Sequence, residues 1–183
     1  MARLPYIDSA NASAPVREAL ARLPAQLNIF RMVANAETCF RPFLSLGTAI
    51  LAQQKLDPLL REHMILRIGH LWNGRYEFHQ HVPIAKAFGA SDEQIRAHSA
   101  GVTDAECFDA KTRAVLAFTT EVVETGKASD ATFKAVASHL SPREIVELLL
   151  AIGFYSTVAM VTETTEIELD EPIGLKVVES AKR

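Results

Sequence analysis

The sequence "DPLLREHMILRIGHLWNGRYEFHQHVP", residues 57–83, contains two consecutive helix patterns separated by a short Asn-Gly turn. Asp57 followed by Pro58 is typical of a helix start, because aspartate caps free backbone N–H groups and proline suits the first helical position. Gly74 predicts the end of the first helix, since glycine is favoured just after a helix C-terminus. A second helix is expected from near Arg75, and it must accommodate the proline that ends the quoted stretch.

Similar start and stop signals recur along the rest of the chain. Ser13 and Ser129 can cap helices, and Ser91 and Ser141 each begin a capping box with the glutamine or glutamate three residues later. Gly126 ends the helix that precedes Ser129. With a further helix in the stretch "AETCFRPFLSLGTAILAQQ", these signals predict an all-α protein of about eight helices.

The composition indicates one compact domain over residues 1–183, with a C-terminal tail from about residue 165. The chain is 49% hydrophobic and 22% charged, which is typical of a globular protein and excludes a disordered one. Its formal net charge of −3 argues against a nucleic acid or an anionic membrane as a partner. The acidic and then mixed tail either packs across a neighbouring subunit or frays.

The cysteines and the apolar segments bear on the cellular location of the protein. Cys39 and Cys107 are far apart and form no C-x-x-C or zinc spacing, so we expect two buried thiols in a reducing compartment. The N-terminal segment has no apolar region of the kind a secretory signal needs, which favours a cytoplasmic protein. Residues 145–161 are very apolar but are interrupted by polar side chains, so we expect a buried core helix there and no membrane span.

A faint internal repeat relates residues 57–69 to residues 141–153. The cap, the following proline, a leucine and a glycine coincide at one offset, which predicts two similar helices packed through small residues, although any capped buried helix has these features. Glu62 aligns with Val146 in this comparison. If the two positions are equivalent, Glu62 lies where an apolar side chain would serve, so its carboxylate is a candidate for function.

The histidine-rich second helix supplies the other candidates. Glu77 and His81 are four residues apart and share a helix face, whereas His79 points elsewhere. Because the turn is tight, the helix carrying Glu62 is expected to run antiparallel to this one, so Glu62 and His81 can meet. Contact is expected either directly, through a bridging water, or with the help of a kink at Pro83.

The stretch "LREHMILRIGHLWNGRYEFHQHVPIAKAFGASDEQIRA", residues 60–97, resembles the carboxymuconolactone decarboxylase and alkylhydroperoxidase-D-like family. Peroxidase members carry a glutamate, a C-x-x-C and then a histidine, and these positions hold Glu62, Gly74, Glu77 and His81 here. The resemblance implies an all-α homotrimer or homohexamer that acts on a small molecule. Without the two cysteines no thiol peroxidase chemistry is expected from this motif, because that reaction needs a thiolate and a resolving thiol.

The decarboxylase members also lack the cysteine pair, so the resemblance favours proton-transfer chemistry on a small carboxylated lactone from aromatic catabolism, or on another organic acid. Such a step requires no metal or organic cofactor. His81 is then the expected general acid, Glu62 orients its ring, and Glu77 positions the substrate or relays protons. An acidic substrate also needs a cation, and Arg67 or Arg75 is the candidate.

Several alternatives stay open from the sequence. Glu62 can be an ordinary helix charge paired with Lys55, Arg61 or His63, and Glu77 with His81 can be a solvated pair. Trp72 and Tyr76 can line a substrate pocket, the core or an oligomer seam, and His70 and His79 can be capping or packing residues. A metal site built from the glutamates and histidines is disfavoured, because the chain has no E-x-x-H or H-x-x-x-H pair. A binding protein that has lost its chemistry is the third possibility.

Overall fold

The computed structural model describes residues 1–181, and all of its regular secondary structure is helical. The helices of this part of the chain are α1 (Ala14–Ala21), α2 (Asn28–Val33), α3 (Glu37–Ala52), α4 (Pro58–Leu71), α5 (Arg75–Ala87), α6 (Asp92–Ser99), α7 (Ala110–Thr125), α8 (Asp130–Ala137), α9 (Pro142–Thr165) and α10 (Lys176–Ala181). The all-α prediction is confirmed.

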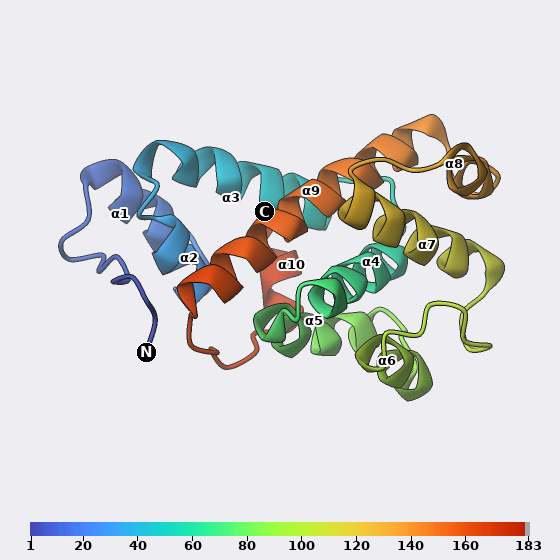
Figure 1. Cartoon of the computed structure of the whole chain (residues 1–183). Helices are drawn as coiled ribbons and strands as arrows, with labels where there is room; N and C mark the ends of the chain where they lie inside the picture. Colours follow the sequence, from blue (N-terminus) through green and yellow to red (C-terminus); the bar gives the residue numbers. More distant parts are fainter. Residues whose placement is uncertain (182–183) are drawn as a thin grey trace.

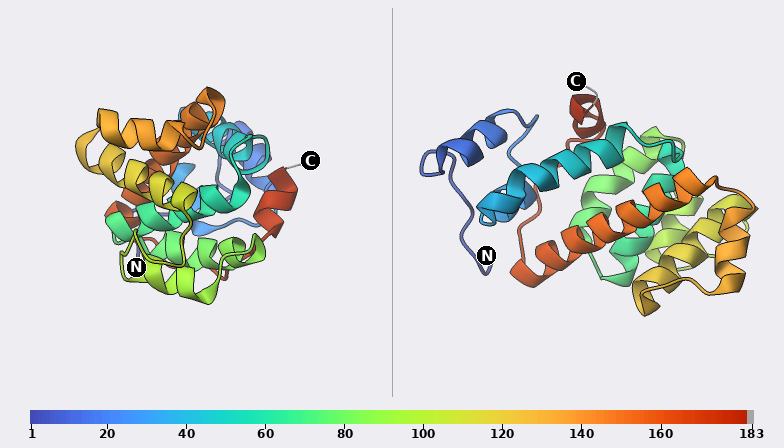
Figure 2. Two further views of the ribbon diagram at one scale, coloured as in Figure 1. Left: turned by 90° about the vertical axis from the view of Figure 1, so that its right-hand side faces the viewer. Right: turned by 90° about the horizontal axis from the view of Figure 1, so that it is seen from above.

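Helix α4 is the centre of the molecule. It packs against α7 and α9 on one side and against α5 and α6 on the other, as Figures 1 and 2 show. Ten of its fourteen residues are buried, and these include charged ones as well as Met64, Ile65 and Ile68. Full burial of such apolar side chains stabilises the fold by about 1.5–3 kcal/mol each, so α4 organises the main hydrophobic core.

The predicted capping residues lie where helices begin. The Asp57 carboxylate accepts hydrogen bonds from the second and third backbone N–H groups of α4, and Ser91 and Ser141 form capping boxes. Ser13 is a partial exception, because its hydroxyl donates to Glu37 and makes no hydrogen bond to the α1 backbone. Helices α2 and α10 were not expected. Both have six residues and neither begins with a side-chain cap, so neither has a start signal.

The turn between α4 and α5 differs from the prediction in which residue takes the left-handed conformation. Asn73 has φ +53°, whereas Gly74 has φ −72°, a value open to any residue. Asparagine tolerates the left-handed region better than most residues. The chain therefore has another reason for glycine at position 74, and that reason lies in the site described below.

The predicted pairing of α4 with α9 is real, but the two helices are not equivalent. They pack together, yet Gly153 is exposed and a Cβ there would have no atom within 4 Å, so the glycines do not form the contact. Glu62 is fully buried, whereas Val146 is 56% exposed. The inference that Glu62 replaces a buried apolar residue is therefore wrong, and the function of its carboxylate must be judged from its contacts.

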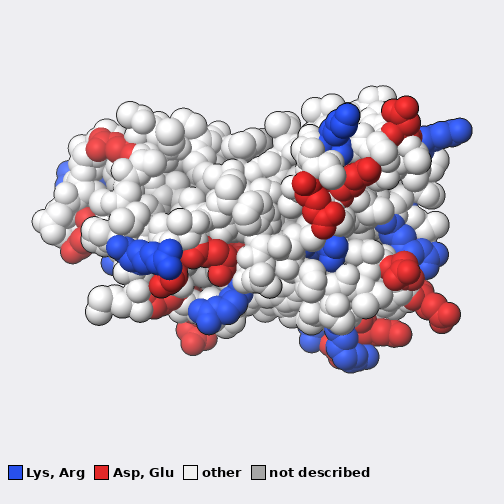
Figure 3. All heavy atoms as spheres, in the orientation of Figure 1, with Lys and Arg blue, Asp and Glu red and all other residues white. Residues whose placement is uncertain are grey.

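Helix α9 combines a buried face with an apolar exposed face. Among the described residues it alone is long and apolar enough to cross a membrane, but 44% of its most apolar window is buried in this molecule, so this is weak support for a span. Figure 3 shows few charged side chains over the centre of the face where α9 and α3 lie in Figure 1. The exposed apolar residues of α9 are Val146, Leu149, Leu150 and Met160.

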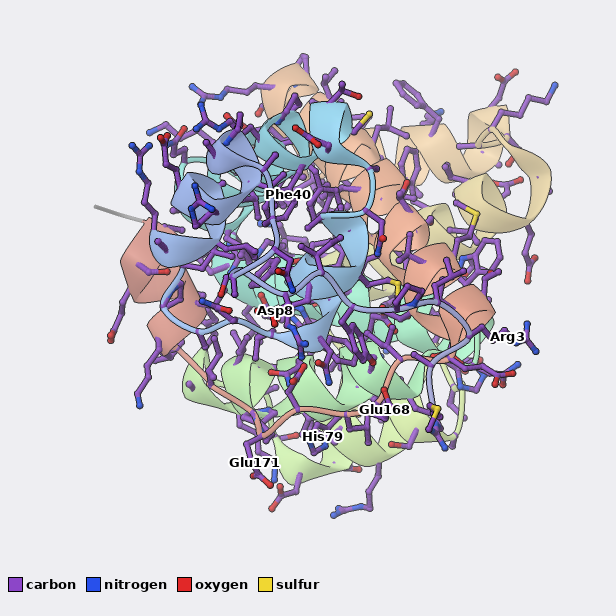
Figure 4. All side chains as sticks on the ribbon, turned by 90° about the vertical axis from the view of Figure 1, so that its left-hand side faces the viewer. Arg3, Asp8, Phe40, His79, Glu168 and Glu171 are labelled. Carbon is purple, nitrogen blue, oxygen red and sulfur yellow. The ribbon has the colours of Figure 1, made fainter. Side chains whose placement is uncertain are left out.

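The C-terminal segment packs on its own chain as far as it is described, and residues 182–183 of the predicted tail lie outside the described part. Glu168 accepts hydrogen bonds from the Tyr6 hydroxyl and the Ala2 N–H. Asp170 accepts from the Tyr76 hydroxyl at 2.7 Å, and its carbonyl contacts His79 Nε2 at 2.9 Å. Figure 4 shows the segment running beside His79 before it reaches α10.

Candidate active site

Helix α5 presents one face to a cavity of about 420 Å³. Tyr76, Glu77, Gln80, His81 and Ile84 line it from this helix, at the spacing expected of one helical face. The other walls come from α3, α9, α10 and the segment around the end of α1 and the start of α2, and most of their lining side chains are apolar. Ionisable side chains at an apolar cavity are the usual composition of a ligand site.

His81 and Glu62 make a direct contact across the antiparallel helices. His81 Nδ1 lies 2.8 Å from Glu62 Oε2, so neither a bridging water nor a kink is required. A carboxylate can only accept here, so the geometry favours the proton on Nδ1 and leaves Nε2 for other partners. Glu62 does not line the cavity. Its contact with Nδ1 fixes the orientation of the His81 ring.

A buried arginine completes this arrangement. Arg61 Nε donates to Glu62 Oε1 at 3.0 Å, and Arg61 Nη1 donates to the Leu51 carbonyl at 2.9 Å. Arg61 and Glu62 are both almost fully buried, and a buried charge is tolerated when it is paired and hydrogen-bonded. Arg61 thus holds the Glu62 carboxyl group at the place where Glu62 accepts from His81. Of the three possible partners of Glu62 in the sequence, Arg61 is the one that pairs with it.

Glu77 is a buried carboxyl group with one free oxygen. Its Oε1 accepts from the Thr162 hydroxyl at 3.1 Å, and its Oε2 has no hydrogen-bond partner among residues 1–181. Burial raises the pKa of Glu77 above its ordinary value, although its hydrogen bonds and His81 oppose the shift. The cavity therefore has a carboxyl group whose pKa is raised by burial.

Gly74 makes room for this carboxyl group. A Cβ atom at position 74 would collide with Glu77 Oε2 and would lie 3.3 Å from Glu77 Cδ. The glycine and the glutamate are therefore a matched pair, because a side chain at 74 would displace the acid.

Three of the four predicted substrate-binding residues do not line the cavity. Arg67 donates to the Thr120 hydroxyl at 2.8 Å and to the Gly101 carbonyl at 3.1 Å. Five helical positions separate it from Glu62, which turns it about 140° away at about 100° per residue. Arg75 and Trp72 lie beside the turn and are exposed. The structure therefore does not bring Arg67, Arg75 and Trp72 together with His81 and Glu77 at this cavity.

Tyr76 does line the cavity, and its hydroxyl is held by Asp170. His79 faces Asp170 and not the cavity, as its helical position predicted. The cations that line the cavity are Arg22 and Arg41, and Arg41 is already paired with Glu18 at 2.9 Å. Neither arginine was expected at the site, because neither lies within a recognisable catalytic motif.

Tyr155 and Thr162 were also not expected at the site from the sequence. The Tyr155 ring meets the His81 ring edge to face, with centroids 5.1 Å apart and an interplanar angle of 89°. Burial raises the pKa of Tyr155, so it stays a neutral phenol. Both residues belong to α9. Thr162 comes 85 positions after Glu77, so no local sequence pattern connects these residues to α5.

The cysteines lie apart from this site. Cys39 is exposed and Cys107 is half-buried, so the expectation of two buried thiols is wrong, and neither lines the cavity. Both lie near helix ends, Cys39 in the first turn of α3 and Cys107 in the loop before α7, where burial is incomplete.

Comparisons with known proteins agree with this architecture. Residues 38–121 match the model of the carboxymuconolactone decarboxylase family. A solved alkylhydroperoxidase AhpD core from Ralstonia eutropha, described as an uncharacterized peroxidase-related protein, superposes with a TM-score of 0.79 at 16% identity, covering 100% of this chain and 97% of that one. A peroxidase-related protein from a Silicibacter species gives a TM-score of 0.73 at 15% identity, with 92% of each chain covered.

A third structure, a protein of unknown function from Agrobacterium tumefaciens, gives a TM-score of 0.67 at 23% identity over 75% of this chain and 94% of that one. No curated protein sequence matches the chain significantly. At these identities the solved structures establish the fold and leave activity open. Residues 38–121 of this chain are therefore similar to the carboxymuconolactone decarboxylase family, and its fold is that of the alkylhydroperoxidase AhpD-like proteins.

Proposed function

We propose that this protein is an enzyme that transfers a proton to a small carboxylated lactone or another organic acid, most simply during decarboxylation. The observation that carries the proposal is the 2.8 Å contact between Glu62 Oε2 and His81 Nδ1, at the edge of a cavity that also contains the buried Glu77. An oriented imidazole and a carboxyl group with a raised pKa are the components of general acid catalysis.

In the proposed step, the bond between the substrate carbon and its carboxylate breaks and carbon dioxide leaves. The electron pair of that bond stays on the substrate, delocalised into the ring or an adjacent carbonyl. In this step His81 starts with both ring nitrogens protonated: Nδ1–H donates to Glu62 and Nε2 gives its proton to the carbon. Glu77 then passes its proton to His81 and is reprotonated from water, so each turnover consumes one proton. Glu62 keeps the ring oriented throughout, and the step as written uses no metal or organic cofactor.

An acidic substrate needs a cation, and the proposal gives this role to Arg22. Arg41 lines the cavity too, but it already pairs with Glu18. Among the described residues no ion pair or hydrogen bond of the Arg22 side chain is present. Arginine suits a carboxylate because its planar fork can donate two parallel hydrogen bonds.

The test is carbon dioxide release from a panel of lactone acids and other organic acids. His81→Ala should lower kcat/KM on any substrate found by about a hundred- to ten-thousand-fold, the usual contribution of general acid catalysis. His79→Ala is the matched control, because this histidine lies on the same helix and contacts Asp170 outside the cavity. Equal turnover by wild type and His81→Ala would contradict the proposal.

Thiol peroxidase activity is the alternative suggested by the structural relatives. It has less support, because Gly74 and Glu77 stand where the cysteine pair would be and neither Cys39 nor Cys107 lines the cavity. A binding protein without chemistry also has less support, since it would not need titratable groups gathered at one apolar cavity. Hydroperoxide reduction driven by a dithiol, if lost in a variant lacking both cysteines, would favour the peroxidase.

We also propose that the protein works in the cytoplasm as a homotrimer or homohexamer. The exposed apolar face of α9 supports assembly, because apolar patches of this kind usually mark contact surfaces. Light scattering on the purified protein tests the proposal. The variant Leu150→Lys should dissociate the assembly, and a wild-type protein that is monomeric at micromolar concentration would contradict it.

A further inference from the structure

The cavity is larger and more apolar than a small lactone acid requires. Its volume is about 420 Å³. A cavity of about 150 Å³ lined by aliphatic and aromatic side chains already holds a benzene molecule. An occupant that fills the space must therefore be larger than one aromatic ring, and burying it is favourable only if most of its surface is apolar.

The two ends of the lining differ in character. Helix α5 contributes the acid and the imidazole, Glu77 and His81, whereas the side chains from α9 are Phe154, Tyr155 and Val158. Helix α3 is mixed: it adds Phe43 and Leu44, two hydroxyl-bearing residues and Arg41, which pairs with Glu18. Such a site matches a molecule with one acidic end and a long or broad apolar body.

We propose that the natural substrate is an amphipathic carboxylic acid. Its acid end lies at Glu77 and His81, and its apolar body, larger than a single ring, lies along Phe43 and Phe154. The placement of the acid end rests on the proposed function, since it makes His81 the proton donor. The size and apolar character of the body rest on the cavity alone.

Gly47 limits the width of the apolar part of the cavity. It lines the cavity from α3, and a Cβ atom there would lie 2.9 Å from Phe154 Cζ, closer than real Cβ contacts come. The Phe154 ring stacks on Phe43 with centroids 4.6 Å apart, and it meets Tyr155 edge to face at 5.4 Å. Because these rings restrict its retreat, an added methyl group at position 47 must push Phe154 toward the open cavity.

The first test measures binding and involves no turnover. Saturated monocarboxylates from acetate to dodecanoate are titrated into the wild-type protein by calorimetry, below their micelle concentrations. Affinity should rise about fourfold per added methylene, from about 0.8 kcal/mol for each one buried, until the cavity is full, with one site per chain. Alcohols of equal length should bind more weakly. Affinity that is flat or falls with chain length, or equal affinity for the alcohols, would overturn the proposal.

The second test uses a matched pair of glycine variants. Gly47→Ala should weaken binding of the longest acids about tenfold and leave the shortest unchanged, because the methyl group removes space from the apolar end. Gly153→Ala is the control, since Gly153 also lies inside a helix and its Cβ would meet no atom within 4 Å. Equal effects of Gly47→Ala on short and long acids, or the same effect from both variants, would count against the proposed body.

The two proposals fail in different ways. The saturated acids have no labile bond, so their binding tests the cavity without testing catalysis. If long acids bind and none of the longer β-keto or unsaturated acids built on them releases carbon dioxide, the proposed function is wrong and the inference about the occupant stands. If only small polar lactone acids turn over and long acids do not bind, the inference about the occupant is wrong.

Discussion

Glu62 and His63 are neighbours on α4 and belong to two different buried polar clusters. The clusters differ in their chemical groups and in their access to the cavity. Glu62 accepts from His81, which borders the cavity. His63 Nδ1 lies 2.8 Å from His98 Nε2, and the Phe108 ring packs against both imidazoles, with centroids 5.5 and 5.0 Å away. The first cluster combines an imidazole with a carboxyl group and the open space of the cavity. In the second cluster, two imidazoles contact each other and pack against the aromatic ring of Phe108.

The difference shows what makes a buried histidine available for chemistry. Burial lowers the pKa of His63 to about 4 and that of His98 to about 3, and the nearest carboxylates, Asp109, Glu62 and Asp57, only partly offset the effect at His63. Arg67 and His70 lower the pKa of His98 further. These two rings are neutral packing groups near neutral pH. His81 has a carboxylate in contact and space beside it, which is what a proton donor needs.

The largest expected effect separates the two clusters by activity. On a substrate that wild type turns over, Glu62→Ala should lower kcat by about a hundredfold or more, because His81 loses its orienting acceptor. His98→Gln keeps a hydrogen-bonding group beside His63 and should lower kcat by less than about threefold. Steady-state kinetics on the two variants checks this, and a comparable loss in both would remove the distinction between the clusters.

Acid stability is the second contrast, and here the His63 and His98 pair should dominate. The pKa of each ring is lower in the folded protein than in the unfolded chain, so the unfolded chain binds more protons as pH falls below about 6.5. The stability contributed by the neutral pair is therefore present above that pH and is lost progressively toward pH 4. Thermal unfolding between pH 7 and pH 4 should show a steep fall, and His98→Gln should flatten it. An identical slope in this variant would contradict the assignment.

Glu77 should show the opposite relation between stability and activity. Its pKa is raised in the folded protein, so the buried carboxylate is unfavourable above the pKa of about 4.3 that it has when unfolded. Glu77→Gln removes the titration and should raise the thermal midpoint near pH 7 by a few degrees while lowering kcat. A variant that is both less stable and fully active would show that Glu77 is an ordinary buried polar group.

The smallest predicted effect concerns the glycine that accommodates Glu77. Gly74→Ala should displace the Glu77 carboxyl group, because the new Cβ would occupy the position of Oε2. We expect about a tenfold loss of kcat with little change in the far-ultraviolet circular dichroism, since the backbone at 74 does not require glycine. The double variant Gly74→Ala, Glu77→Gln should be no slower than Glu77→Gln alone. An additive loss would indicate that Gly74 acts through the turn.

Local sequence signals predicted most of the fold because α4, α6, α7, α8 and α9 begin at serine or aspartate caps. They failed at α2 and α10, which are six residues long and have no cap. In the site, the meeting of Glu62 and His81 followed from two helices joined by a tight turn. The neighbours on α9 did not, because Tyr155 and Thr162 reach the site through tertiary packing alone. Arg67 does not line this cavity, because helical rotation, and not distance along the chain, decides which side chains of a helix share a site.

The most direct test of the central claim is nitrogen NMR of the histidine rings during titration with octanoate, a non-reacting acid. We expect that the proton on His81 Nδ1 is retained and that the His81 Nε2 resonance shifts on binding. The ring resonances of His63 and His98 should not change. A His81 ring whose Nδ1 is unprotonated, or whose Nε2 does not change while the ligand binds, would contradict the claim that Glu62 holds this imidazole ready to act in the cavity.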